Sequence, residues 1–154
     1  MSIPMRKEDT IKDPYDLERF LTAQAITFQT ALEELQSGQK RTHWIWFIFP
    51  QLAGLGRSET SKYYGIKSPD EARQYLAHPL LGTRLVQSAE TVLSVGNRPI
   101  HEILPPPDDK KLQSSMTLFE LVAGSGTVFS RVLDQCFSGK RDKNTEYLFH
   151  AHTR

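Results

Sequence analysis

The sequence predicts an all-α fold, a compact multihelical single domain of about six to eight helices. Apolar residues recur every three or four positions along most of the chain, which is the spacing of a helix with one buried face. Capping residues and prolines stand where such helices would begin, and glycines stand where they would end. The length of 154 residues suits one domain with one core. We expect this helical domain over residues 13–150, after a flexible segment over residues 1–12.

The first predicted helix begins at the pair Asp13 and Pro14 and ends before Gly38. Asp13 is a favourable N-cap, and the fixed backbone angle of Pro14 suits the first helical position. Between these ends, apolar residues form a stripe along one helix face: Leu17, Phe20, Leu21, Phe28, Leu32 and Leu35. The spacing therefore predicts a long amphipathic helix that buries this stripe.

The run from Trp44 to Phe49 is continuously apolar, and periodicity does not divide it between a strand and a helix. Aromatic residues and isoleucines favour a strand. A lone strand, however, would leave its backbone donors and acceptors unpaired in the core, and no second strand of similar quality follows. We therefore predict a short buried helix that ends at Pro50, then a compact loop and a helix over residues 59–64.

Two helices are predicted in the middle of the chain. Ser68 and Glu71 have the spacing of a capping box, in which each side chain accepts a hydrogen bond from the backbone N–H of the other residue. This pattern predicts a helix over residues 69–77. A second helix is predicted from Pro79, with an apolar side that continues until Gly96.

The last third of the sequence predicts a connector and three helices. Residues 98–107 are interpreted as the connector, with the three prolines at 105–107 forming a stiff polyproline-like link. Asp108 or Asp109 can cap the next helix. The three helices are predicted from there to about Val122, from Ser125 or Thr127 to about Phe137, and over residues 142–149.

Composition argues against several classes of partner. The formal net charge is +1, and no clustered basic face of the kind that selects nucleic acids is indicated. No stretch approaches the length of a membrane span, and the N-terminus lacks the apolar run of a signal peptide. Cys136 is the only cysteine, so no internal disulfide can form. We therefore predict a cytoplasmic protein that binds neither nucleic acid nor membrane.

His150 and His152 lack a third spaced ligand, so no metal or cofactor is predicted.

Four motifs spread over nearly the whole chain carry a resemblance to a known family: HWIWFIFPQ (43–51), GLGRS (54–58), YLAHPLLGTRL (75–85) and DDKKLQSSMTLFE (108–120). In this order they resemble an uncharacterised bacterial family of domains of unknown function, the DUF1810 family, which is sometimes labelled calpastatin-like. The resemblance implies an all-helical domain and supplies no reaction. Protease inhibition is not carried over from the label, because such an inhibitor is expected to be an extended, disordered segment, whereas this chain has the apolar pattern of a folded core.

A candidate binding site is predicted around residues 43–58 for an anionic, planar small molecule of the nucleotide or ADP-ribose class. Trp44 and Trp46 lie on different sides of any regular element, so one of them can offer a stacking face. The Gln51 amide can supply polar contacts. His43 is the candidate catalytic residue, since histidine titrates close to neutral pH and can act as a general acid or base.

The anionic part of the ligand is assigned to a glycine loop and to arginines. Gly54 and Gly56 can expose backbone N–H groups before a helix, and Arg57 adds a guanidinium. Arg84 is a second candidate cation, because it falls on an otherwise apolar helix. The predicted ligand-binding residues are thus Trp44, Trp46, Gln51, Gly54, Gly56, Arg57 and Arg84.

Each of these features has a structural alternative. The tryptophans can be core anchors, the glycine loop a tight turn, and Arg84 a member of an ion pair. Lys111 lies about one helical turn from two serines at 114 and 115, a spacing that suits a nucleophile and base but also plain helical serines. Two classes of function stay open: a ligand-binding protein or enzyme, and a noncatalytic interaction domain whose aromatic run is core. A concave pocket beside His43 and one tryptophan favours the first, and fully buried indoles favour the second.

Overall fold

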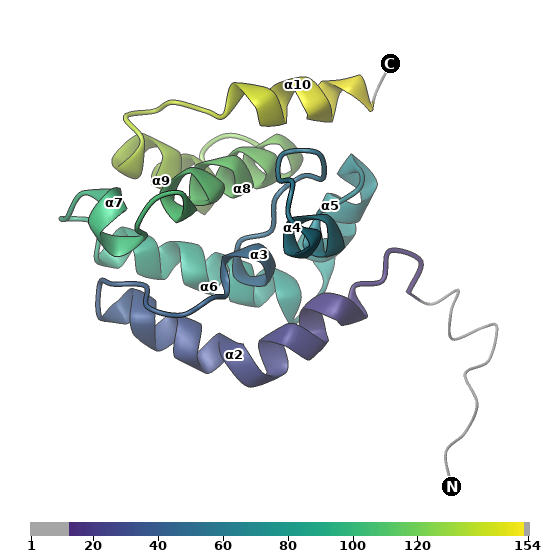
Figure 1. The fold of residues 1–154 in the computed structure, drawn as a ribbon. Coiled ribbons are helices and arrows are strands. Elements are labelled where there is room, and N and C mark those ends of the chain that lie inside the picture. Colours follow the sequence, from purple (N-terminus) through teal and green to yellow (C-terminus); the bar gives the residue numbers. More distant parts are fainter. Residues whose placement is uncertain (1–12, 153–154) are drawn as a thin grey trace, which may run out of the picture.

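The computed structural model describes residues 13–152, and these residues fold into nine helices (Figure 1). The predicted all-α class is confirmed. The flexible segment predicted over residues 1–12 lies outside the described residues. Six helices have at least seven residues, in line with the six to eight predicted: α2 (Glu18–Gln36), α5 (Pro69–Ala77), α6 (Leu81–Ser94), α8 (Asp108–Ala123), α9 (Val128–Cys136) and α10 (Lys143–Ala151). Three are shorter: α3 (Ile45–Ile48), α4 (Glu59–Tyr64) and α7 (Ile100–Ile103).

The long helices pack in successive layers. Figure 1 shows α2 and α10 on opposite faces of the molecule, with α6, α9 and α8 between them. In agreement, α6 contacts both α2 and α9, and α8 contacts α9, α5 and α10. Aromatic rings connect the layers through one buried apolar cluster. Phe20 on α2 meets Tyr75 on α5 edge to face at 5.0 Å between ring centroids, and Phe119 on α8 lies 5.5 Å from Tyr75.

The start of α2 differs from the prediction. The helix begins at Glu18 and not at Pro14, because Asp16 has a φ of 52°, which is outside the right-handed helical region. The N-cap is Leu17, so the predicted N-cap, Asp13, and the predicted first helical residue, Pro14, are both wrong. Asp13 still contributes to the start of the helix, since its carboxylate accepts from the backbone N–H groups of Leu17 at 2.8 Å and Glu18 at 3.1 Å.

The helix predicted over residues 69–77 is confirmed as α5. The hydroxyl of Ser68 accepts from the backbone N–H of Glu71 at 3.1 Å, as the capping box requires. The prediction for the reciprocal hydrogen bond is wrong by one residue. The Glu71 carboxylate accepts from the backbone N–H of Lys67, at 3.2 Å, and not from that of Ser68. Its other oxygen pairs with Arg19 on α2, at 2.6 Å. Glu71 therefore joins α5 to α2 as well as ordering the start of its own helix.

The cap gives a first prediction on stability. Replacing Ser68 by Ala is expected to lower the free energy of unfolding by about 1 kcal/mol, because a backbone N–H at the helix N-terminus loses its acceptor. Ser68→Asp should retain much of the stability, since a carboxylate accepts the same hydrogen bond and suits the positive end of the helix dipole. Urea denaturation of both variants measures the two effects. Equal losses in both would reject the capping role.

The second half of the chain follows the predicted order of elements, with three corrections. The connector predicted over residues 98–107 contains a short helix, α7. The helix expected from Pro79 begins at Leu81. The His78 Nδ1 atom accepts hydrogen bonds from the backbone N–H groups of residues 80 and 81 at this start. The prolines at 105–107 form a turn and not an extended link, because the Asp108 N–H donates to the Pro105 carbonyl at 3.0 Å. The predicted helices near 108–122, 127–137 and 142–149 are confirmed as α8, α9 and α10.

The aromatic run forms the predicted short helix, α3, and the helix predicted over residues 59–64 is α4. Leu52, between α3 and α4, and Ile66, after α4, form an isolated parallel bridge that closes the base of residues 52–66. At this base the Ala53 N–H donates to the Ile66 carbonyl at 2.7 Å. We call residues 52–66 the α4 segment. Apart from this bridge, the described chain has no β-structure.

Candidate functional site

The first tryptophan of the aromatic run is a core residue. Trp44 is 0% exposed, and its indole Nε1 donates to the Glu34 carboxylate of α2 at 2.9 Å. The same carboxylate accepts from the backbone N–H groups of Arg41 and Thr42, at 2.7 and 2.9 Å, and from the Thr42 hydroxyl. Trp44 therefore holds the chain between α2 and α3 in place, as the structural alternative for this residue expects.

These hydrogen bonds make Glu34 a source of pH dependence. Burial raises the pKa of its carboxyl group, but the hydrogen bonds from Thr42, Arg41 and Trp44 outweigh burial and bring the pKa from 4.5 down to about 2. Because the folded protein prefers the ionised form, Glu34 contributes its stability fully above about pH 4.5. The contribution is lost as the pH falls toward 2.

The corresponding prediction compares the wild type with Glu34→Gln. At about pH 6 the variant should unfold more easily in urea, because an amide oxygen replaces the charged acceptor of four donors. The difference in unfolding free energy should shrink as the pH falls toward about 2, where the wild-type carboxyl also loses its charge. A difference that stays constant over this range would contradict the assignment of this pH dependence to Glu34.

The second tryptophan lies on the other side of α3. Trp46 is partly buried, and the Lys111 Nζ atom lies over its ring, 5.0 Å from the centroid. Trp46, Gln51 and Gly56 line one common cavity, so the structure brings three of the predicted binding residues together. This cavity has a volume of only about 10 Å³, which is room for a water molecule and not for a planar ligand.

The remaining predicted site residues do not line that cavity. His43 and Arg57 are exposed, and Gly54 is exposed in a turn with a φ of 102°. Arg84 is not an unpaired cation, which corrects one premise of the prediction. Its guanidinium donates to the Gln24 side chain at 3.3 Å and stacks over an α2 phenylalanine, Phe28, at 4.8 Å.

Of the two serines near Lys111, Ser114 has structural partners, whereas the Ser115 hydroxyl is buried and has no hydrogen-bond partner among the described residues. The single hydroxyl proton of Ser114 is shared between the Lys110 carbonyl and the Asp142 carboxylate, both at 3.1 Å, while Lys111 lies 3.5 Å from the Asp108 carboxylate. No hydrogen bond joins Lys111 to Ser114 or Ser115 in the described chain, so a nucleophile and base are not assembled there. Within residues 13–152 there is also no cluster of three potential metal ligands, and no helix is long and apolar enough to cross a membrane.

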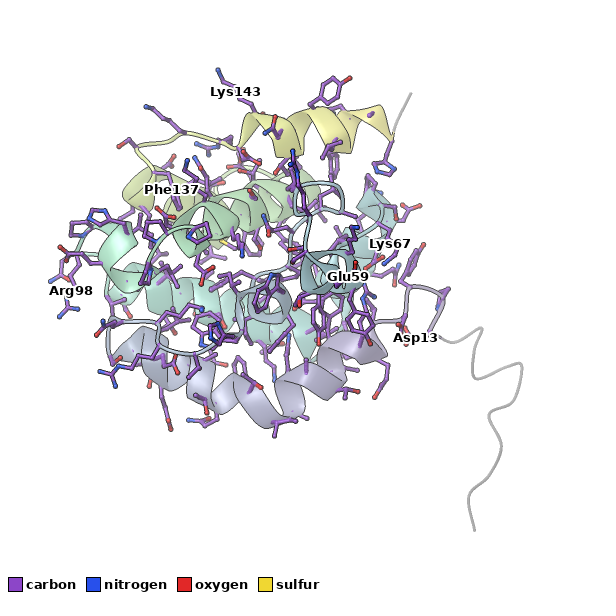
Figure 2. All side chains as sticks on the ribbon, in the orientation of Figure 1. Asp13, Glu59, Lys67, Arg98, Phe137 and Lys143 are labelled. Atoms are coloured by element: carbon purple, nitrogen blue, oxygen red, sulfur yellow. The ribbon has the colours of Figure 1, made fainter. Side chains whose placement is uncertain are left out.

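A larger groove lies beside α4, and it contains aromatic and cationic side chains. Its volume is about 510 Å³. Tyr63 from α4 and Tyr15 from the turn before α2 supply aromatic rings, while Lys62 and Lys67 supply ammonium groups. Figure 2 shows Lys67 on the same side of the molecule as Glu59 of α4 and Asp13 of that turn. The complete lining is Pro14, Tyr15, Asp16, Arg19, Lys62, Tyr63, Lys67, Ser68 and Glu71, and we call it the Tyr63 groove.

The floor of the Tyr63 groove is a buried ion pair. The side chains of Arg19 and Glu71 are each 2% exposed, and their charges compensate each other at 2.6 Å. All five N–H groups of the guanidinium have acceptors, because it also donates to the carbonyls of Tyr15, Asp16, Tyr63 and Gly65. Arg19 therefore positions both walls of the groove, and it has no donor left for a ligand.

The solvent-exposed charges of the groove lie at its rim. The Lys62 side chain is 66% exposed, and the nearest carboxylate oxygen, on Glu59, is 3.9 Å from its Nζ. The Lys67 Nζ lies 3.4 Å from the Gly65 carbonyl and belongs to an exposed residue. Two lysines thus outnumber the single exposed carboxylate in the lining, that of Asp16. The rim therefore favours an anion.

An adjoining hollow is larger but has the opposite charge. It measures about 690 Å³ and shares Pro14 and Tyr15 with the Tyr63 groove. Its charged lining residues are Asp13 and Glu18, whose carboxylates would repel an anionic group. An anionic planar ligand is therefore better matched by the Tyr63 groove than by this larger hollow.

The sequence alone did not reveal the Tyr63 groove, because its two walls are far apart in the chain. One wall comes from residues 14–19 and the other from residues 62–71, and the hydrogen bonds of Arg19 hold them together. One local signal was present in the sequence: the helix over residues 59–64 carries two adjacent tyrosines. In the structure, none of the residues of this helix is buried. An exposed aromatic on such a helix, Tyr63, is a candidate for contact with a ligand.

Comparisons with known proteins agree with the fold and assign no activity. A family model described as a protein of unknown function (DUF1810) matches residues 14–149. The chain is similar to the crystal structure of the conserved hypothetical protein Rv1873 from Mycobacterium tuberculosis, with a TM-score of 0.87 and 47% sequence identity. The similarity covers 90% of this chain and 99% of that one. No curated protein gives a significant match.

Proposed function

The chain belongs to the DUF1810 family, whose description names no function, and from the geometry we propose that it binds an anionic, planar small molecule in the Tyr63 groove. The family resemblance carried by the sequence motifs is thereby confirmed. The observation that carries the proposal is the combination, in one groove of about 510 Å³, of two tyrosine rings with two solvent-exposed lysines. No reaction is part of this proposal.

The groove residues suit the two parts of a nucleotide or an ADP-ribose. Tyr15 and Tyr63 can cover a planar base with their rings, and aromatic contacts of this kind add to the gain from apolar burial. Lys62 and Lys67 can meet phosphate oxygens as mobile point charges. Because Arg19 and Glu71 neutralise each other below, the lysines set the charge that a ligand meets in the groove. The same ligand class was expected from the sequence, at a neighbouring place.

The sequence-based site remains a separate proposal that the same experiments address. It places the ligand against Trp46, Gln51 and Arg57, with His43 as the titratable group. Gly56 and Ser61 lie on the cavity side of the α4 segment, whereas Lys62 and Tyr63 lie on the groove side. Variants on the two sides of this segment therefore separate the two locations.

The test measures the affinity of ADP-ribose and ATP by isothermal titration calorimetry, after a thermal-shift screen that also includes uncharged adenosine. Tyr63→Ala should weaken binding about tenfold, on the order of 1.4 kcal/mol for a lost stacking contact. Lys62→Ala and Lys67→Ala should each have a similar effect and should reduce the dependence of binding on salt. Adenosine should bind more weakly than ATP.

Matched controls come from α10, whose Tyr147 and Lys143 do not line the groove. Tyr147 is 65% exposed, compared with 56% for Tyr63, so Tyr147→Ala removes a similar ring without touching the groove. Lys143, at the top of Figure 2, serves in the same way for the groove lysines. Equal losses in the groove variants and in these controls would contradict the proposed site. A loss confined to Arg57→Ala and His43→Ala would instead favour the sequence-based site.

One observation favours the alternative function, a noncatalytic interaction domain. The aromatic run is mainly core, since Trp44 and Phe49 are 0% exposed and Phe47 is 8% exposed. This alternative needs no small ligand, and it predicts that none of the tested nucleotides raises the apparent melting temperature. A ligand that binds only the folded protein must raise that temperature, so the screen separates the two functions.

A further inference from the structure

One residue that lines the cavity beside α4, Trp46, carries an unusual polar atom. The Nε1 atom of Trp46 is buried and has no hydrogen-bond acceptor among the described residues. Leaving such a donor unsatisfied is unfavourable, so a buried indole N–H normally has a partner. The other tryptophan follows this rule, because the Trp44 indole donates to Glu34. The indole N–H of Trp46 therefore needs an acceptor that the described residues do not provide.

The space beside Trp46 has the size and the lining for such an acceptor. Its volume of about 10 Å³ matches the smallest cavity that holds one water molecule. Besides Trp46, the lining includes three residues with polar side chains, Gln51, Ser61 and Tyr64. A buried water typically makes about three hydrogen bonds, and an indole donor with an amide and hydroxyl groups meets that requirement.

We propose that Trp46, Gln51 and the α4 segment enclose a binding site for a single water molecule, which accepts a hydrogen bond from the Trp46 indole. This site is independent of the function proposed for the Tyr63 groove. The bound water joins α3 to α4, which is otherwise a helix without any buried residue. Because α4 also carries Lys62 and Tyr63, the water helps to hold one wall of the groove in its position.

The test is an NMR experiment on protein labelled with ¹⁵N at the tryptophans. Two indole N–H resonances are expected, and Trp46→Phe identifies one of them by removing it. The Trp46 indole proton should show a direct cross-relaxation peak with water, of the sign that marks a long-lived bound molecule. The Trp44 indole is an internal control and should show no such peak, since its acceptor is a carboxylate.

Two variants of the α4 segment test the location. Gly56 has an ordinary backbone conformation, but a Cβ added there would lie 2.5 Å from the Cβ and Oγ atoms of Ser61. Gly56→Ala should therefore disturb the cavity and abolish the water peak of Trp46. Thr60→Ala is the matched control, because Thr60 is exposed and does not line the cavity, and the peak should persist.

Three results would overturn the proposal. The first is the absence of a water peak at Trp46 in the wild type, which would mean a dry cavity. The second is a peak with the sign of chemical exchange, accompanied by hydrogen exchange as fast as in free tryptophan, which would mean a site open to bulk solvent. The third is a water peak of wild-type intensity in Gly56→Ala, which would place the water elsewhere.

Discussion

Replacing Arg19 by Ala is expected to lower the free energy of unfolding by about 3 to 5 kcal/mol, because the Glu71 carboxylate would be left buried without its counter-charge. The variant also leaves without a donor the carbonyls of four residues: Tyr15, Asp16, Tyr63 and Gly65. The loss is a large share of the 5 to 15 kcal/mol, roughly, that stabilises a typical domain. Urea denaturation monitored by circular dichroism measures it.

An exposed ion pair on α5 provides the control for Arg19. Arg73 and Asp70 are 2.7 Å apart, which is nearly the same separation as in the buried pair, but their side chains are 50% and 72% exposed. Arg73→Ala should therefore lower the unfolding free energy by less than about 1 kcal/mol, because solvent screens the pair. If the Arg19 and Arg73 variants lost similar stability, burial could not be the reason for the importance of Arg19.

Trp44→Ala is expected to cause a loss of about 3 to 5 kcal/mol, the usual range for a fully buried tryptophan replaced by alanine. Trp44 is 0% exposed, packs against Phe49 at 6.3 Å between ring centroids, and is one of the donors to Glu34. The variant opens a cavity and removes that donor. The midpoint and slope of urea unfolding give the change in free energy.

Trp46→Ala is the comparison for the second tryptophan. It should also be destabilising, but by less than Trp44→Ala, because Trp46 is only partly buried and its indole N–H bonds to no described residue. An unchanged denaturant midpoint in Trp46→Ala would show that its ring adds nothing to packing. A larger loss in Trp46→Ala than in Trp44→Ala would reverse the assigned roles of the two residues.

Local signals in the sequence were sufficient for most of the helices. Ser68 and Asp142 cap α5 and α10 with their own side chains, and Gly124 ends α8 with a φ of 101°. Each of these effects depends on a few neighbouring residues, which is why residue types and spacing predict it. Even the ambiguous aromatic run was assigned to a helix correctly, because no partner strand was present to pair with it.

Long-range contacts explain what the sequence did not reveal. The backbone conformation of Asp16 interrupts the predicted start of α2. The Arg19 guanidinium stabilises this arrangement, because it donates hydrogen bonds both to the Asp16 carbonyl and to the Glu71 carboxylate. The Tyr63 groove depends on the same contacts, which span more than forty residues of the chain. The spacing of residue types along a sequence does not predict contacts between residues this far apart. The premise of an unpaired Arg84 failed for the same reason, since Gln24, sixty residues away, is its partner.

Binding of an anionic, planar ligand in the Tyr63 groove is tested most directly by a titration of the ¹⁵N-labelled protein with ADP-ribose, followed by two-dimensional NMR. Saturable shifts are expected for the backbone amide signals of Tyr15, Lys62, Tyr63 and Lys67, from both walls of the groove. The same titration in Tyr63→Ala should require about tenfold more ligand. Shifts confined to residues 43–57, with the groove amides unchanged, would contradict binding in the groove and place the ligand at the aromatic run.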